Sequence, residues 1–321
     1  MGEVLTSQSG QPLRGVDALS FLESVSGEPE RSRSSYWNYE IETFKVSADG
    51  TLQGLTVLGI ANSKTDPLRR FMHWVLQAPY RRMGAAFPHF KEAERLGRLI
   101  ASRQGRLYTG DMQRQALTLA LLQANQAVPS AGRFAAVIGD GFGVMSSLLL
   151  LSVPGIKVVL VNLTKSLLLD LVQISRTVPD AGVALARDET ELGGALSDPN
   201  VRLVAVRADD CGLLAKVPME LAINIHSLQE MDAPIIAEYF RLLRASPAAR
   251  TLFYCCNRIE KKLNDGSITR FNDFPWSAQD ECLVDEVCPW DEFVYHSRPP
   301  FWRSAPGTRH RLAVLEKGGA R

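Results

Sequence analysis

The chain has 321 residues, of which 45% are hydrophobic and 22% charged, the proportions of an ordinary globular protein. Its 36 basic and 35 acidic residues nearly cancel, so no charged field attracts nucleic acid or anionic lipid, and we expect neither nucleic acid nor a membrane as partner. Five cysteines without a C-x-x-C pair predict neither a disulfide framework nor a structural zinc site, which favours a cytoplasmic location and no metal.

The sequence pattern divides the chain into three parts. Residues 1–33 are polar and rich in Ser, Glu and Arg, which predicts a flexible N-terminal segment. Residues 34–128 are expected to form a mainly helical N-terminal region that contacts the substrate or covers it as a lid. A Pro-Ser-Ala-Gly break at residues 129–132 then opens the domain that we expect over residues 129–321.

Two helices are predicted within the N-terminal region. Residues 88–103 open with a proline and continue with apolar residues at helical spacing. Residues 111–128 begin with Asp111 as an N-cap and continue through a leucine-rich stretch.

From residue 134 onward, strand-like and helix-like patterns alternate, which is typical of a parallel sheet with covering helices. The expected strands are residues 134–138, 157–161, 201–206, 221–225, 251–256, 292–295 and 310–315. The expected helices between the first five strands are residues 144–151, 165–177, 189–197 and 229–245. We therefore predict an α/β fold with a doubly wound, seven-stranded sheet.

The first of these strands runs into a glycine-rich turn made of Gly139, Asp140, Gly141, Phe142 and Gly143. Strand, glycine turn and helix together form the corner that holds the ligand in a doubly wound sheet. Val144 stands where the dinucleotide fingerprint G-x-G-x-x-G would have its third glycine, which argues against an NAD-type oxidoreductase. The spacing instead resembles the first motif of class I S-adenosylmethionine (SAM)-dependent methyltransferases.

Polar residues follow three further strands, at the edge where such a sheet binds its ligand. We expect them to hold the cofactor together with the glycine turn: Asn162 and Leu163 after the second strand, Asp209 and Asp210 after the third, and Asn224 and Ile225 at the end of the fourth. Asn162 stands where an acidic residue usually accepts both ribose hydroxyls, and its side chain offers one accepting oxygen. Asp209 or Asp210 could accept a hydrogen bond from the adenine amino group.

His226 is the candidate catalytic base, because it follows the fourth strand next to the glycine turn. An alkyl hydroxyl is a poor nucleophile until a base removes its proton, and imidazole titrates in the useful range. Glu230 lies one helical turn further on and could orient the ring.

Residues 257–302 form a long insertion that is dense in aromatic and charged side chains. Loops of this length commonly cover or bind a ligand, and aromatic faces beside carboxylates suit a ring-bearing or polyhydroxylated substrate. The alternative is a small separate core beneath a long loop. The candidate substrate residues of the chain are Tyr36, Trp37, Gln229, Arg258, Trp276, Asp285 and Tyr295.

Several linked motifs resemble the sugar O-methyltransferase family: NIHSLQEM at residues 224–231, FYCCNR at 253–258, RFNDFPW at 270–276, DEVCPW at 285–290 and SYW at 35–37. The resemblance covers residues 34–315. It implies the seven-stranded, Rossmann-like class I methyltransferase fold, SAM as the methyl donor and a hydroxylated small-molecule acceptor. The chain departs from the family pattern at Val137, where an acidic residue is usual, and at Asn162.

The sequence therefore predicts a SAM-dependent O-methyltransferase that acts on a hydroxyl of a sugar or glycosylated small molecule. Alternative acceptors are a natural-product hydroxyl, as in natural product biosynthesis, or a carboxylate of a small molecule or peptide. A metal-assisted variant using Asp209, Asp210 or residues 285–286, and a non-catalytic SAM-binding protein, are further alternatives. A homodimer is also compatible with the pattern.

Overall fold

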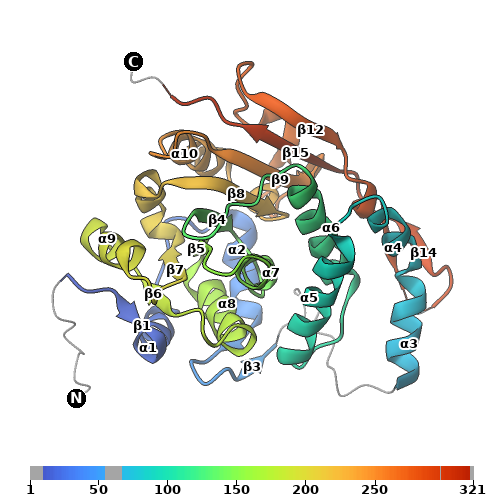
Figure 1. Cartoon of the computed structure of the whole chain (residues 1–321), viewed down its shortest axis with the longest axis horizontal. Helices are drawn as coiled ribbons and strands as arrows, with labels where there is room; N and C mark the ends of the chain where they lie inside the picture. The colour runs from blue at the N-terminus through green and yellow to red at the C-terminus, as the bar shows by residue number, and fades with distance from the viewer. Residues whose placement is uncertain (1–9, 55–66, 297, 319–321) are drawn as a thin grey trace.

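The structure is a computed structural model that describes residues 10–54, 67–296 and 298–318. Its centre is one mixed sheet of nine strands (Figure 1). In spatial order these are β1 (Leu13–Arg14), β6 (Val183–Leu185), β7 (Leu203–Arg207), β5 (Lys157–Asn162), β4 (Phe134–Ile138), β8 (Met219–Ile225), β9 (Leu252–Arg258), β15 (Thr308–Val314) and β12 (Glu281–Val287). The six strands from β6 to β9 are parallel, whereas β1 and β15 run antiparallel to their neighbours.

The seven strands from β7 to β12 have the order of the class I methyltransferase sheet. Numbered along the chain, they lie in the order 3-2-1-4-5-7-6, with β15 inserted antiparallel between β9 and β12. The predicted Rossmann-like fold is confirmed. The sheet is larger than the predicted seven strands, because β6 and β1 extend it beyond β7.

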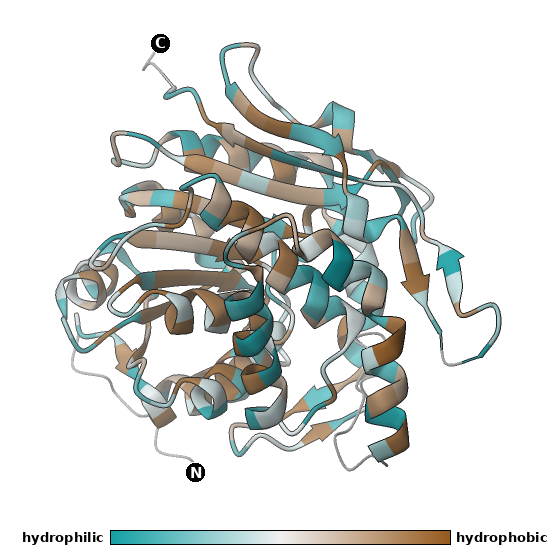
Figure 2. Cartoon of the chain, turned by 45° about the vertical axis from the view of Figure 1, so that its right-hand side comes forward, coloured by the Kyte–Doolittle hydropathy of each residue, from teal (hydrophilic) through white to brown (hydrophobic). Residues whose placement is uncertain are grey.

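Helices cover both faces of the sheet, and each face has its own buried apolar cluster. One face carries α1 (Gly15–Val25), α5 (Phe90–Arg103), α6 (Gly110–Ala124), α7 (Val144–Ser152) and α8 (Thr164–Thr177). The other carries α9 (Glu189–Ser197), the 3-10 segment η2 (Ala208–Lys216) and α10 (Ala233–Arg244). Figure 2 shows that hydrophobic residues dominate the central strands, which are buried on both sides and therefore lack a polar face.

The N-terminal helices pack directly on the sheet layer. Helices α5 and α6 contact α7, and their apolar residues belong to the same buried cluster as the strands (Figure 1). The smaller elements of this region are α2 (Ser35–Glu40), η1 (Ile41–Thr43), β2 (Lys45–Val46), β3 (Leu52–Gln53), α3 (Pro67–Leu76) and α4 (Ala78–Gly84). The boundary near residue 129 stays a prediction. Within the described residues, no helix has the length and apolarity that a membrane span requires.

Four expectations differ from the structure. Ordered structure was expected to begin near residue 34, but β1 and α1 precede it; residues 1–9 of that segment lie outside the described residues. The helix expected over residues 229–245 is divided into η3 (Leu228–Glu230) and α10, because Pro234 fits only the first turn of a helix. The N-cap of α6 is Thr109 rather than Asp111.

The sixth strand of the sheet is β12, not the segment around residue 293. Residues Phe293–Tyr295 form β13, which pairs with β14 (Trp302–Ser304) outside the main sheet. The rest of the predicted insertion contains the hairpin of β10 (Glu260–Lys262) and β11 (Ile268–Arg270), η4 (Phe271–Asp273) and η5 (Pro289–Asp291). Strand β12 is exposed along almost its whole length, so no apolar pattern marks it.

The glycine turn between β4 and α7 needs left-handed backbone at each of its three glycines. Gly139, Gly141 and Gly143 have φ values of 71°, 84° and 62°. A Cβ on Gly143 would lie 2.3 Å from Ile174 Cγ1, whereas a Cβ on Gly141 would have no atom within 4 Å. Gly143 is therefore needed for both conformation and space, and Gly141 for conformation alone.

We expect Gly143→Ala to destabilise the protein by about 3 kcal/mol and Gly141→Ala by about 1 kcal/mol, since only the first adds a steric clash to the strained backbone. Urea unfolding measures both values. Gly193→Ala is the control, because Gly193 lies in α9 with free space around its Cβ; it should stabilise the protein by about 0.5 kcal/mol. Equal losses in the two turn variants would contradict the packing argument.

Candidate functional site

A cavity of about 420 Å³ lies at the carboxyl ends of β4, β5 and β8, where an open α/β sheet binds its ligand. Its wall contains ten of the residues predicted from the sequence: Trp37, Gly139, Asp140, Gly141, Phe142, Asn162, Leu163, Ile225, His226 and Glu230. The structure thus brings the glycine turn and the candidate base to one cavity.

Asp140 stabilises the start of α7. Its two carboxylate oxygens accept hydrogen bonds from the backbone N–H groups of Met145 (2.9 Å) and Ser146 (2.7 Å), which have no partner within the helix. Burial raises the pKa of Asp140 above its usual value, although these hydrogen bonds oppose the shift. The carboxylate is thereby engaged with the helix, while the residue itself borders the cavity.

Asn162 is fixed by a buried carboxyl group that the sequence did not single out. Asp170 in α8 is fully buried; its Oδ2 accepts from Asn162 Nδ2 (2.8 Å), and its Oδ1 accepts from the Gly143 N–H (3.0 Å). Because the Asn162 amide nitrogen faces Asp170, its Oδ1 bonds the Leu163 N–H (2.9 Å) and keeps one lone pair for a ligand. Burial, and then the charge of Asp140, raise the pKa of Asp170 well above its usual range.

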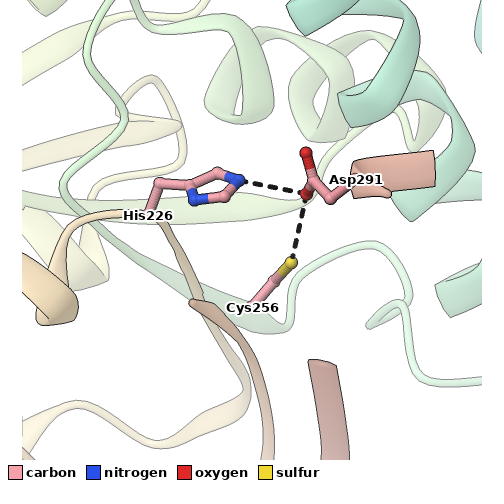
Figure 3. A group of neighbouring side chains, drawn as sticks. All are labelled: His226, Cys256 and Asp291. Carbon is pink, nitrogen blue, oxygen red and sulfur yellow. Dashed lines mark hydrogen bonds and ion pairs between the residues drawn. The ribbon is translucent and has the colours of Figure 1, made fainter. Parts of the chain in front are cut away.

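His226 lies in left-handed backbone, with φ of 60°, just after β8. Its Nε2 is 3.0 Å from Asp291 Oδ2 (Figure 3). Its Nδ1 is 3.5 Å from Gln229 Oε1. Burial alone would lower the pKa of His226, but the hydrogen bond and charge of Asp291 outweigh it and raise that pKa. The ring is thus a stronger base than a free imidazole, and Asp291 fixes its orientation.

Asp291, in η5, was missed by the sequence analysis. The residue is 4% exposed. Its Oδ1 accepts from Arg114 Nη1 of α6 (2.7 Å), and its Oδ2 faces His226 and, at 3.7 Å, Cys256 Sγ. Burial would raise the pKa of Asp291, but the charge of Arg114 and the hydrogen bond to His226 hold it well below its usual range. The available signal was its position directly after the DEVCPW motif.

His226, Cys256 and Asp291 also place potential metal-ligand atoms within 4.8 Å of one another (Figure 3). Arg114 donates to the same Asp291 carboxylate, so its positive charge opposes that of a bound cation. The arrangement suits an oriented base better than a metal centre.

The sequence suggested that Glu230 orients His226. In the structure, the carboxylate that bonds the ring is that of Asp291. Glu230 lines the cavity, and its Oε1 lies 4.0 Å from Lys261 Nζ. Burial raises the pKa of Glu230 to about 7, although the charges of Lys261 and His226 oppose the shift. Lys261 in turn lies over the ring of Tyr36, which does not itself line the cavity.

Three of the predicted cofactor residues have other partners. Asp209 accepts from the backbone N–H groups of residues 31 (3.1 Å) and 32 (2.8 Å), and Asp210 pairs with Arg207 (2.9 Å). Asn224 is fully buried and donates to Ile138 O (2.9 Å). None of the three lines the cavity.

Residues 30–34 form a strap along the cavity. The sequence analysis had assigned most of these residues to the flexible segment. Ser32 and Ser34 line the cavity, and Ser34 Oγ donates to Glu230 O. Glu30 accepts from both the N–H and the hydroxyl of Thr164, at 2.7 Å each, at the start of α8. Together with Asp209, these bonds attach the strap to three elements of the sheet domain.

The remaining candidate substrate residues lie outside the cavity wall. Gln229 Oε1 accepts from the Arg258 N–H (2.7 Å), and this bond fixes Gln229 beside His226 Nδ1. Trp276 stacks on Phe253 in the buried cluster on the other face of the sheet. Asp285 pairs with Arg309 and Arg311 on β15. The hydroxyl of Tyr295 bonds His73 and Gln77 of the N-terminal region.

No family model matches the chain, and no curated protein matches it in sequence. Among solved structures, it is similar to magnesium protoporphyrin IX methyltransferase from Synechocystis PCC 6803 with bound SAM, at 12% identity over 64% of this chain and 80% of that chain, with a TM-score of 0.40. It is also similar to 1,6-didemethyltoxoflavin-N1-methyltransferase from Burkholderia thailandensis, at 14% identity over 63% and 78% of the two chains, with a TM-score of 0.39. A third is an O-methyltransferase family 2 protein from Planctomyces limnophilus in complex with apigenin, at 11% identity over 67% and 64%, with a TM-score of 0.36. The identities are low, so the chemistry of this chain follows from its own residues.

We expect Asn162→Asp to destabilise the protein, by about 2 kcal/mol at pH 8, because it places a second carboxylate beside the buried Asp170. At pH 5 the loss should be smaller, since the pair can then hold a proton. Urea unfolding at the two pH values measures this, with the exposed Asn264→Asp as control. A loss that does not change with pH would show that the two carboxylates do not interact.

Glu230 should make the folded state less stable as pH rises. The folded state keeps the Glu230 proton up to about pH 7, whereas the unfolded chain releases it near pH 4.5, so stability falls between these values. Glu230→Gln should remove about 3 kcal/mol of this pH dependence. Unfolding free energies at pH 4.5, 6 and 8 test it against Glu260→Gln, whose side chain is 56% exposed. Parallel curves for wild type and Glu230→Gln would contradict the raised pKa.

Proposed function

We propose that the protein is a SAM-dependent O-methyltransferase whose acceptor is a hydroxyl of a sugar or another hydroxylated small molecule. The observation that carries the proposal is the His226–Asp291 pair, an oriented base in the wall of the cavity that also contains the glycine turn. Five cysteines, all of them free, support a reducing, cytoplasmic setting for the enzyme.

The residues of the cavity fit the methyl donor. Gly141 has no side chain and no neighbour within 4 Å of a built Cβ, so the turn leaves open space at its tip. Asn162 keeps an accepting oxygen for a ribose hydroxyl, held in place by Asp170. A volume of about 420 Å³ is in the range of sites that enclose a ligand of this size. When bound, SAM supplies a sulfonium methyl group that an attacking substrate oxygen takes over.

His226 performs the proton transfer in this proposal. Asp291 accepts the Nε2–H and fixes the tautomer, so Nδ1 carries the lone pair that takes the hydroxyl proton. Gln229 Oε1, held by the Arg258 N–H, lies 3.5 Å from Nδ1 and can accept the new N–H. Both neighbours thus stabilise the protonated ring, which lowers the free-energy cost of removing the hydroxyl proton while the oxygen attacks the methyl group.

A hydroxyl acceptor is favoured over a carboxylate because a carboxylate needs no base to become a nucleophile. The rest of the cavity wall suits a neutral, ring-bearing molecule with several hydroxyls: it combines the aromatic face of Trp37 with polar groups of Thr109, Gln115 and Glu230. A sugar fits this description, and so does a hydroxylated natural product.

We expect His226→Ala to reduce kcat toward a hydroxyl acceptor by on the order of 100-fold or more, while S-adenosylhomocysteine still binds with unchanged affinity. Methyl transfer to a panel of methyl glycosides, phenols and small carboxylic acids measures the rate, and calorimetry measures the binding. His89→Ala, at an exposed residue outside the cavity, is the control. A His226→Ala enzyme with a tenth or more of wild-type activity would favour the carboxylate alternative.

The pH profile gives a second test of the base. Because Asp291 raises the pKa of His226 above 6.5, kcat should rise with pH through an apparent pKa above that value. Asp291→Asn removes the negative charge, so the rising limb should move to lower pH and the plateau should fall. An unchanged limb in Asp291→Asn would assign the titration to another group.

A further inference from the structure

Arg106 is a buried cation without an acidic partner. The residue is 8% exposed, and its Nη1 donates only to the neutral Gln104 Oε1, at 3.2 Å. Its buried Nε has no hydrogen-bond partner in the described part of the chain. No carboxylate of the described residues lies within ion-pair distance of its guanidinium.

Burying such a group is unfavourable unless a ligand supplies the missing charge and hydrogen-bond acceptors. A buried, unpaired charge costs several kcal/mol, and desolvation accordingly lowers the pKa of Arg106. The guanidinium offers a fork of donors that matches a carboxylate or phosphate. The N–H donors of Arg106 that lack an acceptor therefore point to an anionic group in the cavity that this residue lines.

The side chain is held firmly beside the glycine turn. Its guanidinium stacks on the ring of Phe142, with Cζ 3.8 Å from the ring centroid, and Gln104 Nε2 donates to Phe142 O at 3.0 Å. Asp111 lines the same cavity, and its charge acts on Arg106. Its Oδ1 lies 3.5 Å from Arg114 Nη2, and its Oδ2 accepts from Gln115 Nε2 (3.2 Å), so each oxygen keeps a lone pair for an ammonium group. Arg106 and Asp111 thus give this part of the cavity wall a cation and an anion, the pair that a zwitterion requires.

We propose that Arg106, with Asp111, binds the amino-acid end of the methyl donor: the guanidinium takes the carboxylate and Asp111 takes the ammonium group. This inference rests on the proposed function. Adenosine and a neutral hydroxylated acceptor carry no anion, so the donor's carboxylate is the anionic group among the proposed ligands. Asn162 lies at the ribose position, and Arg106 lies beside Phe142 at the far end of the glycine turn from the β4 strand.

An anionic acceptor is the competing occupant. Arg106 also borders a second cavity of about 190 Å³, which includes Arg98 and His73. Arg98 already pairs with Glu94 at 2.8 Å, so it is a weaker anion site than Arg106. The experiment below separates the two occupants.

The test is calorimetric titration of the full-length wild type and Arg106→Gln with three probes. These are S-adenosylhomocysteine, its decarboxylated analogue and 5′-methylthioadenosine, which lacks the amino-acid end. Arg106→Gln should weaken S-adenosylhomocysteine by about 30-fold and leave the other two probes within twofold of wild type. Asp111→Asn should weaken S-adenosylhomocysteine and its decarboxylated analogue alike and spare 5′-methylthioadenosine. Arg95→Gln, with a side chain 63% exposed on α5, is the matched control.

Arg106→Lys is a second variant in case Arg106→Gln misfolds. It keeps the positive charge but loses the planar fork of donors, so its S-adenosylhomocysteine affinity should lie between those of the wild type and Arg106→Gln. If the wild type binds all three probes and Arg106→Gln changes them equally or not at all, this inference is overturned and the proposed function stands. An anionic acceptor would then be the occupant of Arg106. If the wild type binds none of the probes, the proposed function fails, and the inference fails with it.

Discussion

The buried carboxylate of Asp291 is the contact on which the site depends. It joins Arg114 from α6, in the N-terminal region, to His226 at the end of β8, and it stands in η5 near the C-terminal strands. Removing one partner of a buried ion pair commonly costs about 3–5 kcal/mol, because the other charge is left uncompensated. The interaction that orients His226 therefore also attaches helix α6 to the C-terminal part of the sheet domain. Stability and the orientation of His226 are coupled at this residue.

The charged side chains in and around the cavity differ in whether they have a partner of opposite charge. The charges of Arg114, Asp291 and His226 compensate one another. The Glu230 carboxyl group lies 4.0 Å from the Lys261 ammonium group, so these two can form an ion pair. Arg106 has no carboxylate at ion-pair distance within the described residues, and only the charge of Asp111 acts on it from further away. An apolar core tolerates neither an isolated cation nor an isolated anion, so a buried group without a partner marks the place where a ligand completes the site.

The sequence predicted those parts of the fold that local patterns determine. The strand from Phe134 to Ile138, the glycine turn and α7 follow from an apolar run, three glycines and a helical pattern, and the strand ends with His226 and Asn162 follow from the parallel sheet. Strand β12 could not be predicted from hydrophobicity, because an edge strand is held by backbone pairing and by cross-strand ion pairs such as that of Asp285 with Arg309. The sequence analysis did not identify the hydrogen-bond partners of His226 and Asn162. Asp291 is 65 residues away in the chain, and Asp170 stands inside an apolar helical run, so only the folded arrangement brings them together.

The turn that carries His226 packs directly against the glycine turn. His226 is held in left-handed backbone by its N–H bond to Cys256 O, at 2.8 Å. The next residue, Ser227, donates to Ile138 O at 3.0 Å, and a Cβ on Gly139 would lie 2.4 Å from Ser227 Oγ. Gly139 is therefore glycine for two reasons, its own backbone conformation and the approach of the base-bearing turn. Because the two turns contact each other directly, any shift of the glycine turn moves the imidazole relative to the cavity. In the proposed reaction, the distance between methyl donor and base is therefore determined by backbone packing rather than by flexible side chains.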